Sequence, residues 1–544
     1  MKIHPCRRMS FRRRRGFVLS WLLFGSACAA NAAAPNIYHQ PQSQTVVLYQ
    51  PALFSVEASG PYYQWRKDGV PMAGATSHQL VVAHAQFSNA GLYSVVVSNA
   101  ASSVTSSNVV LAVNSPRGGD IDFLFSSSNS INSYVQALAV QPDGKVIIGG
   151  SFTTVNGAAR ARIARLYADG TTDASFMSGL SGANGGVTSI ALQSDGKVVI
   201  GGGFTTVNGV GRNRIARLNA DGTLDGSFQN QLSGANNVIN SIALQDDLQV
   251  LIGGSFTRIN GVIRTNIARL NPDGNLDTSF QSTASLANGG SVSSIVLQKD
   301  GKLLIGGNFT NVNGVVRNRI ARLNQDGTLD TSFVPVAGSP LIAIQSDGQV
   351  LAGTTRLNVD GSLDASFKKP SVDGFGVYSL AVQSNGKVLI AGQFTKVNGV
   401  GRNSIARLNS DGMLDTSFQD GLSGVTWNSG AARVESLTVQ SDGRVLIGGD
   451  FGEVNGVPAT YFTRLWGEDF PPPIKSIQAS GANVNLTWHS ISNRTYRVQH
   501  NANLSATNWT DLGGDVFASG ATAGKTDSTT GNASQRFYRV LLLP

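Results

Sequence analysis

Acidic residues recur along this chain with types and spacing that could hold a metal ion. The segment Asn219-x-Asp221-Gly222-x-x-Asp225 offers side-chain oxygens at short intervals and a glycine for a tight turn, as calcium loops do. Each copy lacks the full acidic set and the distal bidentate glutamate of an EF-hand. The alternative is an Asp-Gly turn whose later aspartate pairs with an arginine, and the sequence favours it. We therefore expect no metal site and no cofactor.

Nucleophilic chemistry is limited by the supply of histidine and cysteine. The histidines are His4, His39, His78, His84, His489 and His500, and the cysteines are Cys6 and Cys28. None lies between positions 119 and 470, so a Ser-His-Asp triad, a Cys-His pair and a histidine-ligated metal are excluded there. Paired-carboxylate chemistry stays open in principle, but the acids recur in nearly every repeat, whereas a catalytic pair should be singular. We expect that the protein is not an enzyme.

A repeated arginine raises a third kind of chemistry, anion binding. It stands in the motif Ile-Ala-Arg-Leu and its close copies, at Arg165, Arg217, Arg269, Arg322, Arg356, Arg407 and Arg464. An aspartate follows in the motif Asp-x-Ser-Phe, at Asp173, Asp225, Asp277, Asp330, Asp364 and Asp415, and Asp122 ahead of the repeats makes a seventh. Equal numbers of arginine and aspartate favour buried structural ion pairs over a ring of free arginines that binds polyanions.

These motifs must be positioned by repeated β-strands. In one unit, residues 188–193 alternate, an Asp-Gly turn follows, and residues 197–202 form a continuous apolar strand. A loop at residues 204–209 leads to a third strand at 214–218, and a second Asp-Gly turn precedes a short fourth strand that ends at Phe228. Four antiparallel strands in a unit of about fifty residues are typical of a propeller blade.

The number of units predicts a closed ring. The motif Gln-x-Asp-Gly-Lys and its close copies begin at Gln141, Gln193, Gln298, Gln345, Gln383 and Gln440, with a degenerate copy at Gln245. The last unit lacks a proper fourth strand, but residues 119–125 match residues 222–228 at the glycine, the aspartate and the final phenylalanine. The sequence thus predicts a seven-bladed β-propeller over residues 119–470, closed by the strand 119–125, with no exposed strand edge.

The repeated string, from Gln-x-Asp-Gly-Lys through Gly-Gly-x-Phe-Thr-x-Val-Asn-Gly to Ile-Ala-Arg-Leu and Asp-x-Ser-Phe, resembles the bacterial delta-60 repeat. That repeat forms propellers in exported proteins, and the resemblance covers about two thirds of the chain. It implies the propeller fold but brings no catalytic residues. The fifth unit departs from the pattern, because residues 350–357 skip the Phe-Thr-x-Val-Asn-Gly loop.

Small β-sandwich domains are expected on both sides of the propeller, which makes the whole chain all-β. Residues 35–114 resemble an immunoglobulin-like domain, because Trp65 lies on an alternating strand and residues 89–95 match a tyrosine corner in which Val95 replaces the second cysteine. We expect Trp65 in the core. Residues 474–544 resemble a fibronectin type III-like sandwich.

Residues 1–34 have the features of a secretory signal peptide, with a basic start, a short apolar run and small residues at its end. They hold seven of the 42 basic residues and no acid, which leaves 35 basic against 33 acidic residues. This near-neutral balance argues against nucleic-acid binding. We expect an exported, monomeric protein in the periplasm, at the cell surface or outside the cell, with no transmembrane segment in its mature form.

Ligand-binding residues are expected where the repeats differ. If the first strand of each blade is innermost, the Asp-Gly turns share one face, and the variable connectors between blades share the other. The candidates there are Tyr378, Trp427, Asn428, Arg160, Arg212, Arg264, Arg317 and Arg402. The aromatic side chains either stack on a sugar, anchor a protein or fill gaps between blades, and the sequence leaves this open.

The functional hypothesis is an exported, non-catalytic binding, adhesion or scaffold protein that presents a propeller face to a glycan, a cell-envelope component or a protein. One alternative is a propeller enzyme, a lyase or glycosidase, that acts on extracellular polysaccharide. A second alternative is a structural component of a surface layer or matrix.

Overall fold

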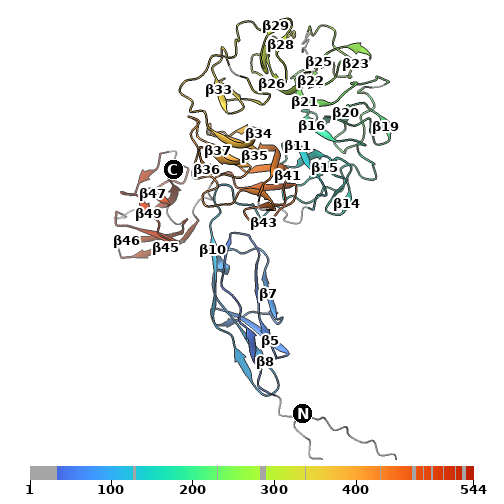
Figure 1. The fold of residues 1–544 in the computed structure, drawn as a ribbon. Coiled ribbons are helices and arrows are strands. Elements are labelled where there is room, and N and C mark those ends of the chain that lie inside the picture. Colours follow the sequence, from blue (N-terminus) through green and yellow to red (C-terminus); the bar gives the residue numbers. More distant parts are fainter. Residues whose placement is uncertain are drawn as a thin grey trace, which may run out of the picture. The chain divides into compact units, whose positions relative to one another are not determined.

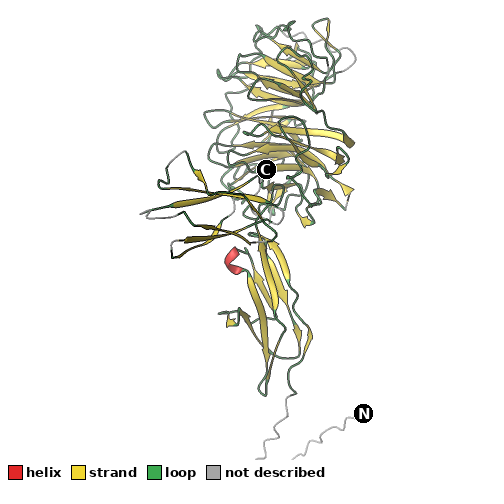
Figure 2. Cartoon of the chain, turned by 90° about the vertical axis from the view of Figure 1, so that its left-hand side faces the viewer, coloured by secondary structure: helices red, strands yellow, loops and turns green. Residues whose placement is uncertain are grey.

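The computed structural model describes residues 33–125, 130–229, 231–281, 290–336, 338–428, 430–468, 473–481, 483–491, 494–505, 508–520, 522–529 and 535–543. The signal peptide expected over residues 1–34 lies almost wholly outside these ranges. Strands dominate, and the one helical element in the described part is a 3-10 turn at Phe87–Asn89 (Figure 2). No described helix has the length and apolar character needed to span a membrane. The all-β fold class is confirmed.

The N-terminal β-sandwich is built around Trp65. Its strands are β1 (Ile37–His39), β2 (Gln44–Val47), β3 (Ala52–Ser55), β4 (Glu57–Ala58), β5 (Tyr62–Lys67), β6 (Val70–Pro71), β7 (Gln79–Val82), β8 (Gly91–Ser98), β9 (Ser103–Thr105) and β10 (Val109–Asn114). The Trp65 side chain is fully buried, its ring lies 6.1 Å from that of Phe54, and its Nε1 donates to the carbonyl of Ser77 at 2.9 Å. Val95 stands opposite Trp65 on β8, so aliphatic packing fills the place of a disulfide.

Each propeller blade contains a three-stranded antiparallel sheet (Figure 1). The innermost strands are β11 (Val135–Val140), β16 (Val187–Leu192), β21 (Ile239–Leu244), β26 (Val292–Leu297), β31 (Ile342–Ile344), β34 (Val372–Val382) and β40 (Arg433–Val439). The middle strands are β12 (Val146–Gly150), β17 (Val198–Gly202), β22 (Val250–Gly254), β27 (Leu303–Gly307), β32 (Val350–Ala352), β35 (Val388–Val397) and β41 (Val445–Asp450). The outer strands are β15 (Ile163–Leu166), β20 (Ile215–Leu218), β25 (Ile267–Leu270), β30 (Ile320–Leu323), β33 (Thr355–Leu357), β37 (Ile405–Leu408) and β44 (Phe462–Leu465). Innermost strands of successive blades touch one another, and β40 touches β11.

The middle strand of a blade is buried on both faces, which explains its continuous apolar sequence. In β12, Val146 and Ile148 pack with Leu446 and Phe462 of the seventh blade, whereas Ile147 packs into the core of the second blade. Full burial of a Val or Ile side chain contributes roughly 1.5–3 kcal/mol. The blades are therefore joined by a core that continues around the ring.

Two segments differ from the sequence-based expectation. The Phe-Thr-x-Val-Asn-Gly segment is a short hairpin and not a loop, because Asn208 (φ 50°) and Gly209 (φ 76°) form the two-residue turn that such a pair favours. These hairpins are β13–β14 (Thr154–Val155, Ala158–Ala159), β18–β19 (Thr206–Val207, Val210–Gly211), β23–β24 (Arg258–Ile259, Val262–Ile263), β28–β29 (Asn311–Val312, Val315–Val316) and β42–β43 (Glu453–Val454, Val457–Pro458), and in the sixth blade β36 (Val400–Gly401) pairs with the end of β35. In the described part of the fifth blade this short hairpin is missing, and β32 is followed directly by β33.

The fourth strand that the sequence predicts is reduced to a single bridge. In the second blade this bridge joins Leu218 and Leu224, after which the chain turns. The turn forms because the Asp225 carboxylate accepts hydrogen bonds from the backbone N–H and the hydroxyl of Ser227, at 2.9 and 2.6 Å. A side chain that binds the backbone two residues on competes with an extended strand.

Residues from both ends of the repeat array close the ring. Ile121 bridges Leu465 just as Leu224 bridges Leu218 within the second blade. Phe125 is buried in the core that the first blade shares with β41 and β44 of the seventh. The seven-bladed propeller is thus completed by the segment ahead of its first blade.

A second β-sandwich follows the propeller. Its strands are β45 (Ile474–Ser480), β46 (Asn483–His489), β47 (Thr495–Asn501), β48 (Thr510–Asp511), β49 (Val516–Phe517), β50 (Thr522–Asp527) and β51 (Phe537–Leu542). Trp488 and Tyr496 form the centre of its core. The buried carboxylate of Asp527 accepts hydrogen bonds from Arg536 and Tyr538.

Candidate functional site

The recurring arginine and aspartate of each blade form a buried ion pair. In the second blade, Arg217 Nε donates to Asp225 Oδ2 at 2.7 Å, and both side chains are more than nine-tenths buried. Equivalent pairs at 2.7–2.9 Å join Arg165–Asp173, Arg269–Asp277, Arg322–Asp330, Arg356–Asp364, Arg407–Asp415 and Arg464–Asp122. The last pair links the end of the array to its beginning.

Each of these arginines also reaches the next blade. Arg217 Nη1 donates to the carbonyl of Pro272 in the third blade at 2.6 Å, and its guanidinium lies 4.8 Å from the ring centroid of Phe228. Arg464 does the same to Ala168 of the first blade, at 2.8 Å. We call each arginine, with its aspartate and the carbonyl of the next blade, a clasp. Seven clasps connect the blades in the described chain. In each clasp the arginine binds both its aspartate and a carbonyl of the next blade.

Six of the seven clasps lower the pKa of their aspartate and so hold it in the ionised form. Burial opposes ionisation of Asp173, but hydrogen bonds from Ser175 and Arg165 outweigh it and lower the pKa of Asp173 to about 2. Hydrogen bonds from Ser366, against the effect of burial, and from Arg356 lower the pKa of Asp364 to about 2. These carboxylates are therefore charged at neutral pH.

The Asp-Gly turns have the geometry of structural turns. The Asp221 carboxylate accepts hydrogen bonds from the backbone and hydroxyl of Thr223, at 2.9 and 2.7 Å, and these bonds lower its pKa. Asp225 Oδ2 accepts from Arg217 and Lys197. No group of three or more His, Cys, Asp or Glu side chains that could hold a metal ion occurs among the described residues.

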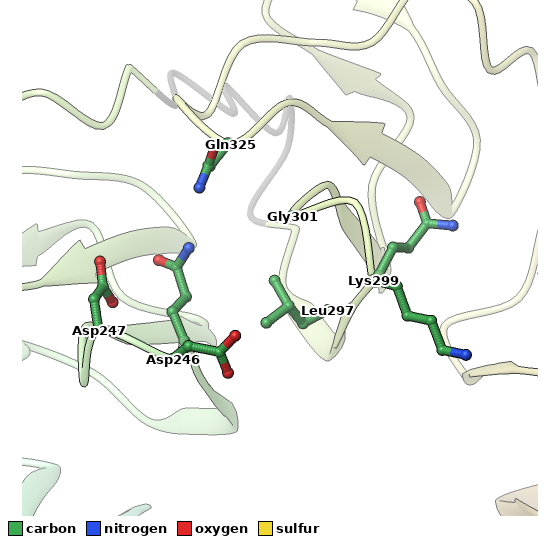
Figure 3. Close-up of a pocket in the computed structure, with 8 residues that line it drawn as sticks. Asp246, Asp247, Leu297, Lys299, Gly301 and Gln325 are labelled. Carbon is green, nitrogen blue, oxygen red and sulfur yellow. The ribbon is translucent and has the colours of Figure 1, made fainter.

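Pockets lie on the face formed by the Asp-Gly turns, which we call the turn face. One, of about 520 Å³, lies between the third and fourth blades, with Asp246 and Asp247 on one side and Lys299 on the other (Figure 3). Another, of about 620 Å³, lies between the seventh and first blades and is lined by Gln440, Asp442 and Arg444. Both pockets are lined by residues of the first turn of each blade. Around the first pocket, Asp246 and Lys299 occupy the variable second position of that turn.

The structure does not gather the five candidate loop arginines. Arg212 Nη1 donates to the carbonyl of its own neighbour, Gly211, at 2.8 Å. The others bind the preceding carbonyl in the same way, as in Arg160–Ala159, Arg264–Ile263, Arg317–Val316 and Arg402–Gly401. Each stays at its own hairpin, and Arg317 and Arg402 are buried.

Of the two candidate aromatic residues, Trp427 belongs to a cluster of rings on the face that carries the hairpins and connectors, which we call the connector face. Trp427 lies in the hairpin of β38 (Val425–Trp427) and β39 (Gly430–Ala431), which extends the outer sheet of the seventh blade. Its ring centroid is 5.9 Å from that of Tyr461, which is 5.8 Å from that of Tyr134 in the first blade. Trp427 and Tyr134 are each 40% exposed. We call these three residues the aromatic sector.

Asn428 is exposed and forms the turn beside Trp427, with a φ of 48°. Tyr378 lies in the sixth blade, where Arg433 stacks on its ring at 5.0 Å from the centroid. Arg433 also pairs with Glu435 at 3.0 Å. Tyr378 thus borders the seventh blade without belonging to the aromatic sector itself.

Gly452 makes room for Trp427. It stands where the other hairpin-bearing blades have threonine, at Thr153, Thr205, Thr257, Thr310 and Thr395. A β-carbon at position 452 would lie 3.3 Å from the Trp427 ring. Such a contact is tighter than normal packing, so the indole lies against a surface that only glycine leaves open.

Two carboxylates accompany the aromatic sector. Asp450 and Glu453 lie on β41 and β42 of the seventh blade, and Thr426 is the strand partner of Glu453. Both side chains are half-buried. Burial raises the pKa of the Tyr461 phenol, and the nearby charge of Asp450 raises it further. The seventh blade therefore carries both aromatic rings and carboxylates, Asp450 and Glu453, on its hairpin side.

The sequence analysis missed Tyr134 and Tyr461 of this sector and the two carboxylates beside it, Asp450 and Glu453. A position-by-position comparison of the seven units could have found two of them. Asp450 aligns with Ser151, Gly203, Ser255, Asn308 and Gln393, and Glu453 aligns with Thr154, Thr206, Arg258, Asn311 and Lys396. The acids occur only in the seventh unit, which is the singularity that a site in a symmetric ring requires.

The repeats match a known protein family. A family model described as Domain of unknown function (DUF5122) beta-propeller matches residues 141–176, 193–228, 245–280, 298–333, 383–418 and 440–467. The divergent fifth unit lies outside these matches. Together with the blades described above, this identifies the chain as a β-propeller repeat protein. A comparison with curated proteins gave no match.

Among solved structures, "Tandem Ig repeats of Dlar" is 19% identical, with 15% of this chain and 48% of that chain covered and a TM-score of 0.14. "Crystal structure of Dscam1 isoform 4.44, N-terminal four Ig domains" is 26% identical, with 14% and 19% covered and a TM-score of 0.13. This chain thus spans less than half of either structure. Likenesses at these TM-scores support no conclusion about function.

Proposed function

We propose that this protein is an exported, non-catalytic binding protein whose propeller holds a glycan at the aromatic sector. Its flanking domains would be an immunoglobulin-like and a fibronectin type III-like sandwich that act as spacers, and its repeats would be of the delta-60 type. The proposal is supported by one observation above all. Among the described residues, only the seventh blade adds a hairpin that carries an exposed tryptophan, and glycine replaces threonine beneath that ring.

The chemistry of the sector suits a sugar. An exposed indole and two tyrosines offer apolar faces with polar edges, a combination that binds a ligand with one apolar and one hydrated side. The carboxylates of Asp450 and Glu453 and the amide of Asn428 can accept or donate hydrogen bonds to hydroxyl groups. The sector also joins residues of the first and last blades, so its geometry depends on a closed ring.

Binding to an array of glycans tests this proposal, with pull-down by insoluble polysaccharides as a second assay. We expect Trp427→Ala and Tyr134→Ala to lose at least tenfold in affinity. Tyr167→Ala is the matched control, because Tyr167 is also a 40% exposed tyrosine but lies in an Asp-Gly turn of the first blade. Wild-type affinity in the Trp427 and Tyr134 variants would exclude the aromatic sector as the binding site.

A polysaccharide-acting enzyme is the second candidate, and one observation favours it. Glu435, Asp450 and Glu453 give the seventh blade a set of acids that no other unit repeats, as a catalytic pair would require. Incubation with each bound polysaccharide, followed by assay for new reducing ends or unsaturated products, separates the two functions. Product formation that Glu453→Gln or Asp450→Asn abolishes would establish the enzyme.

A further inference from the structure

The aromatic sector carries a charge opposite to that of its counterparts in the other blades. At the two positions occupied by Asp450 and Glu453, the other hairpin-bearing blades have neutral side chains or the cations Arg258 and Lys396. At the position of Tyr461, immediately before the outer strand, the first, second and fourth blades have Arg162, Arg214 and Arg319. The change from basic to acidic and aromatic is therefore confined to one place on the ring.

The two carboxylates are not used to hold the fold together. Neither Asp450 nor Glu453 has an ion-pair or side-chain hydrogen-bond partner among the residues that the structure describes. On the neighbouring strand, the cation Arg433 stands opposite Asp450 in the ladder of β40 and β41. Arg433 is already paired with Glu435 at 3.0 Å and stacked on Tyr378. Two carboxylates beside the sector are thus left without an ion-pair partner among the described residues.

The aromatic rings strengthen the same preference. The face of an indole or phenol ring carries negative electrostatic potential and attracts a cation placed above it. Trp427 offers such a face, and its ring packs against the space left by the missing side chain of Gly452. Tyr134 and Tyr461 add two more ring faces, with centroids within 6 Å of one another. The rings and the carboxylates are independent features, and both attract positive charge.

We infer that the ligand of the aromatic sector is a cationic glycan, one whose sugars carry free amino groups. The inference rests on the proposed function and narrows it to a chemical class. A sugar ring stacks on Trp427 or Tyr134, and its ammonium group lies at Asp450 and Glu453. A neutral glycan would leave both carboxylates without a partner, and a uronic-acid polymer would be repelled.

Two oligosaccharides that differ only in charge test this inference. Isothermal titration calorimetry with an oligomer of β-1,4-linked glucosamine, at a pH at which its amines are protonated, is compared with titration of the fully N-acetylated oligomer of equal length. We expect the wild-type protein to bind the amino form about tenfold tighter, from two charge contacts of modest strength. Asp450→Asn with Glu453→Gln should abolish this preference. Asp246→Asn with Asp247→Asn, on the turn face, should keep it.

The outcomes separate the inference from the function on which it rests. Equal binding of both oligomers, still lost in Trp427→Ala, would overturn the cationic class and leave glycan binding intact. Binding of neither oligomer would overturn the inference, and a glycan array without any hit would overturn the function as well. Tighter binding of oligolysine than of the amino oligosaccharide would also overturn it, in favour of a protein partner.

Discussion

The clasps and the aromatic sector differ in how they depend on the repeat: the clasps have the same side chains in every blade, whereas the aromatic sector has side chains that its equivalent positions lack. Every clasp has the same arginine and the same aspartate, joined at 2.7–2.9 Å in all seven blades. The aromatic sector has the backbone positions of the other blades but different side chains on them. Tyr461, for example, has the left-handed backbone and the N–H bond to a preceding phenylalanine carbonyl that Arg162 and Arg214 have.

This contrast shows where a symmetric ring can acquire function. The clasps cannot vary, because a buried arginine without its carboxylate is costly in any blade. The connector face tolerates change, because its hairpins are fixed by backbone hydrogen bonds and by an Asn-Gly turn and not by the exposed side chains. The predictions below test this division, beginning with the largest expected effect.

Removal of a clasp aspartate should destabilise the propeller most. We expect Asp225→Ala to lower the free energy of unfolding by about 3–5 kcal/mol, because it leaves Arg217 buried and unpaired. Asp122→Ala should cost as much and also open the ring, which hydrogen exchange would detect in residues 119–125 and β44. Denaturant unfolding measures the first effect. Asp246→Ala, an exposed turn residue, should change the free energy by less than about 0.5 kcal/mol.

Acid should weaken the same contacts and spare the connector face. The pKa of Asp173 is lowered from 3.8 to about 2 in the folded protein, so its contribution is complete above the unfolded value and is lost as the pH falls through the folded one. This amounts to about 2 kcal/mol for Asp173. Thermal denaturation should thus give a Tm that is stable near neutrality and falls between about pH 4 and pH 2. A Tm that stays constant down to pH 2 would contradict the charged clasp.

Restoration of the repeat residue at position 452 should separate binding from stability. We expect Gly452→Thr to cost only about 1 kcal/mol, since Trp427 is exposed and can move away from the added side chain. Ligand binding should be lost, and the tryptophan emission should shift. The reverse change in the second blade, Thr205→Gly, should lower the free energy of unfolding by a similar amount and leave ligand binding unchanged. Normal ligand binding by Gly452→Thr would show that the space left at Gly452 does not position Trp427.

The loop arginines should give the smallest effect. We expect Arg212→Ala with Arg264→Ala to change the free energy of unfolding by less than about 0.5 kcal/mol and to leave glycan binding intact, because each arginine binds only its neighbouring carbonyl. Retention on a sulfated polysaccharide column should also be unchanged. Weaker retention of the double variant would revive the hypothesis of a polyanion-binding ring.

Much of the fold could be predicted from the sequence because each repeat carries the same strand and turn signals. The strands of each blade appear as the same apolar pattern between the same turns, and the match of residues 119–125 to residues 222–228 indicated how the array closes. The pattern could not show that the predicted fourth strand is reduced to a single bridge. Its alternating residues suit a strand, but the carboxylate of Asp225 binds the backbone at Ser227 and turns the chain.

The candidate site was accessible only in part. Trp427 and Asn428 stand out, because their connector is longer than the others. Tyr134 and Tyr461 do not, because each looks ordinary in its own unit and they meet only through ring closure. Gly452 shows the same limit. The loss of one threonine side chain, in a chain with 63 glycines, has no visible meaning until the indole above Gly452 is seen.

The clasp between Arg464 and Asp122 joins residues that are 342 positions apart. A ribosome makes Asp122 early and Arg464 near the end of the array, so the ring cannot close until Arg464 has been synthesised. Until then the first and last blades present open strand edges to any neighbouring chain. Contacts this distant in sequence also slow folding. The chain therefore carries open strand edges that can pair with another copy for as long as Arg464 and Asp122 are apart.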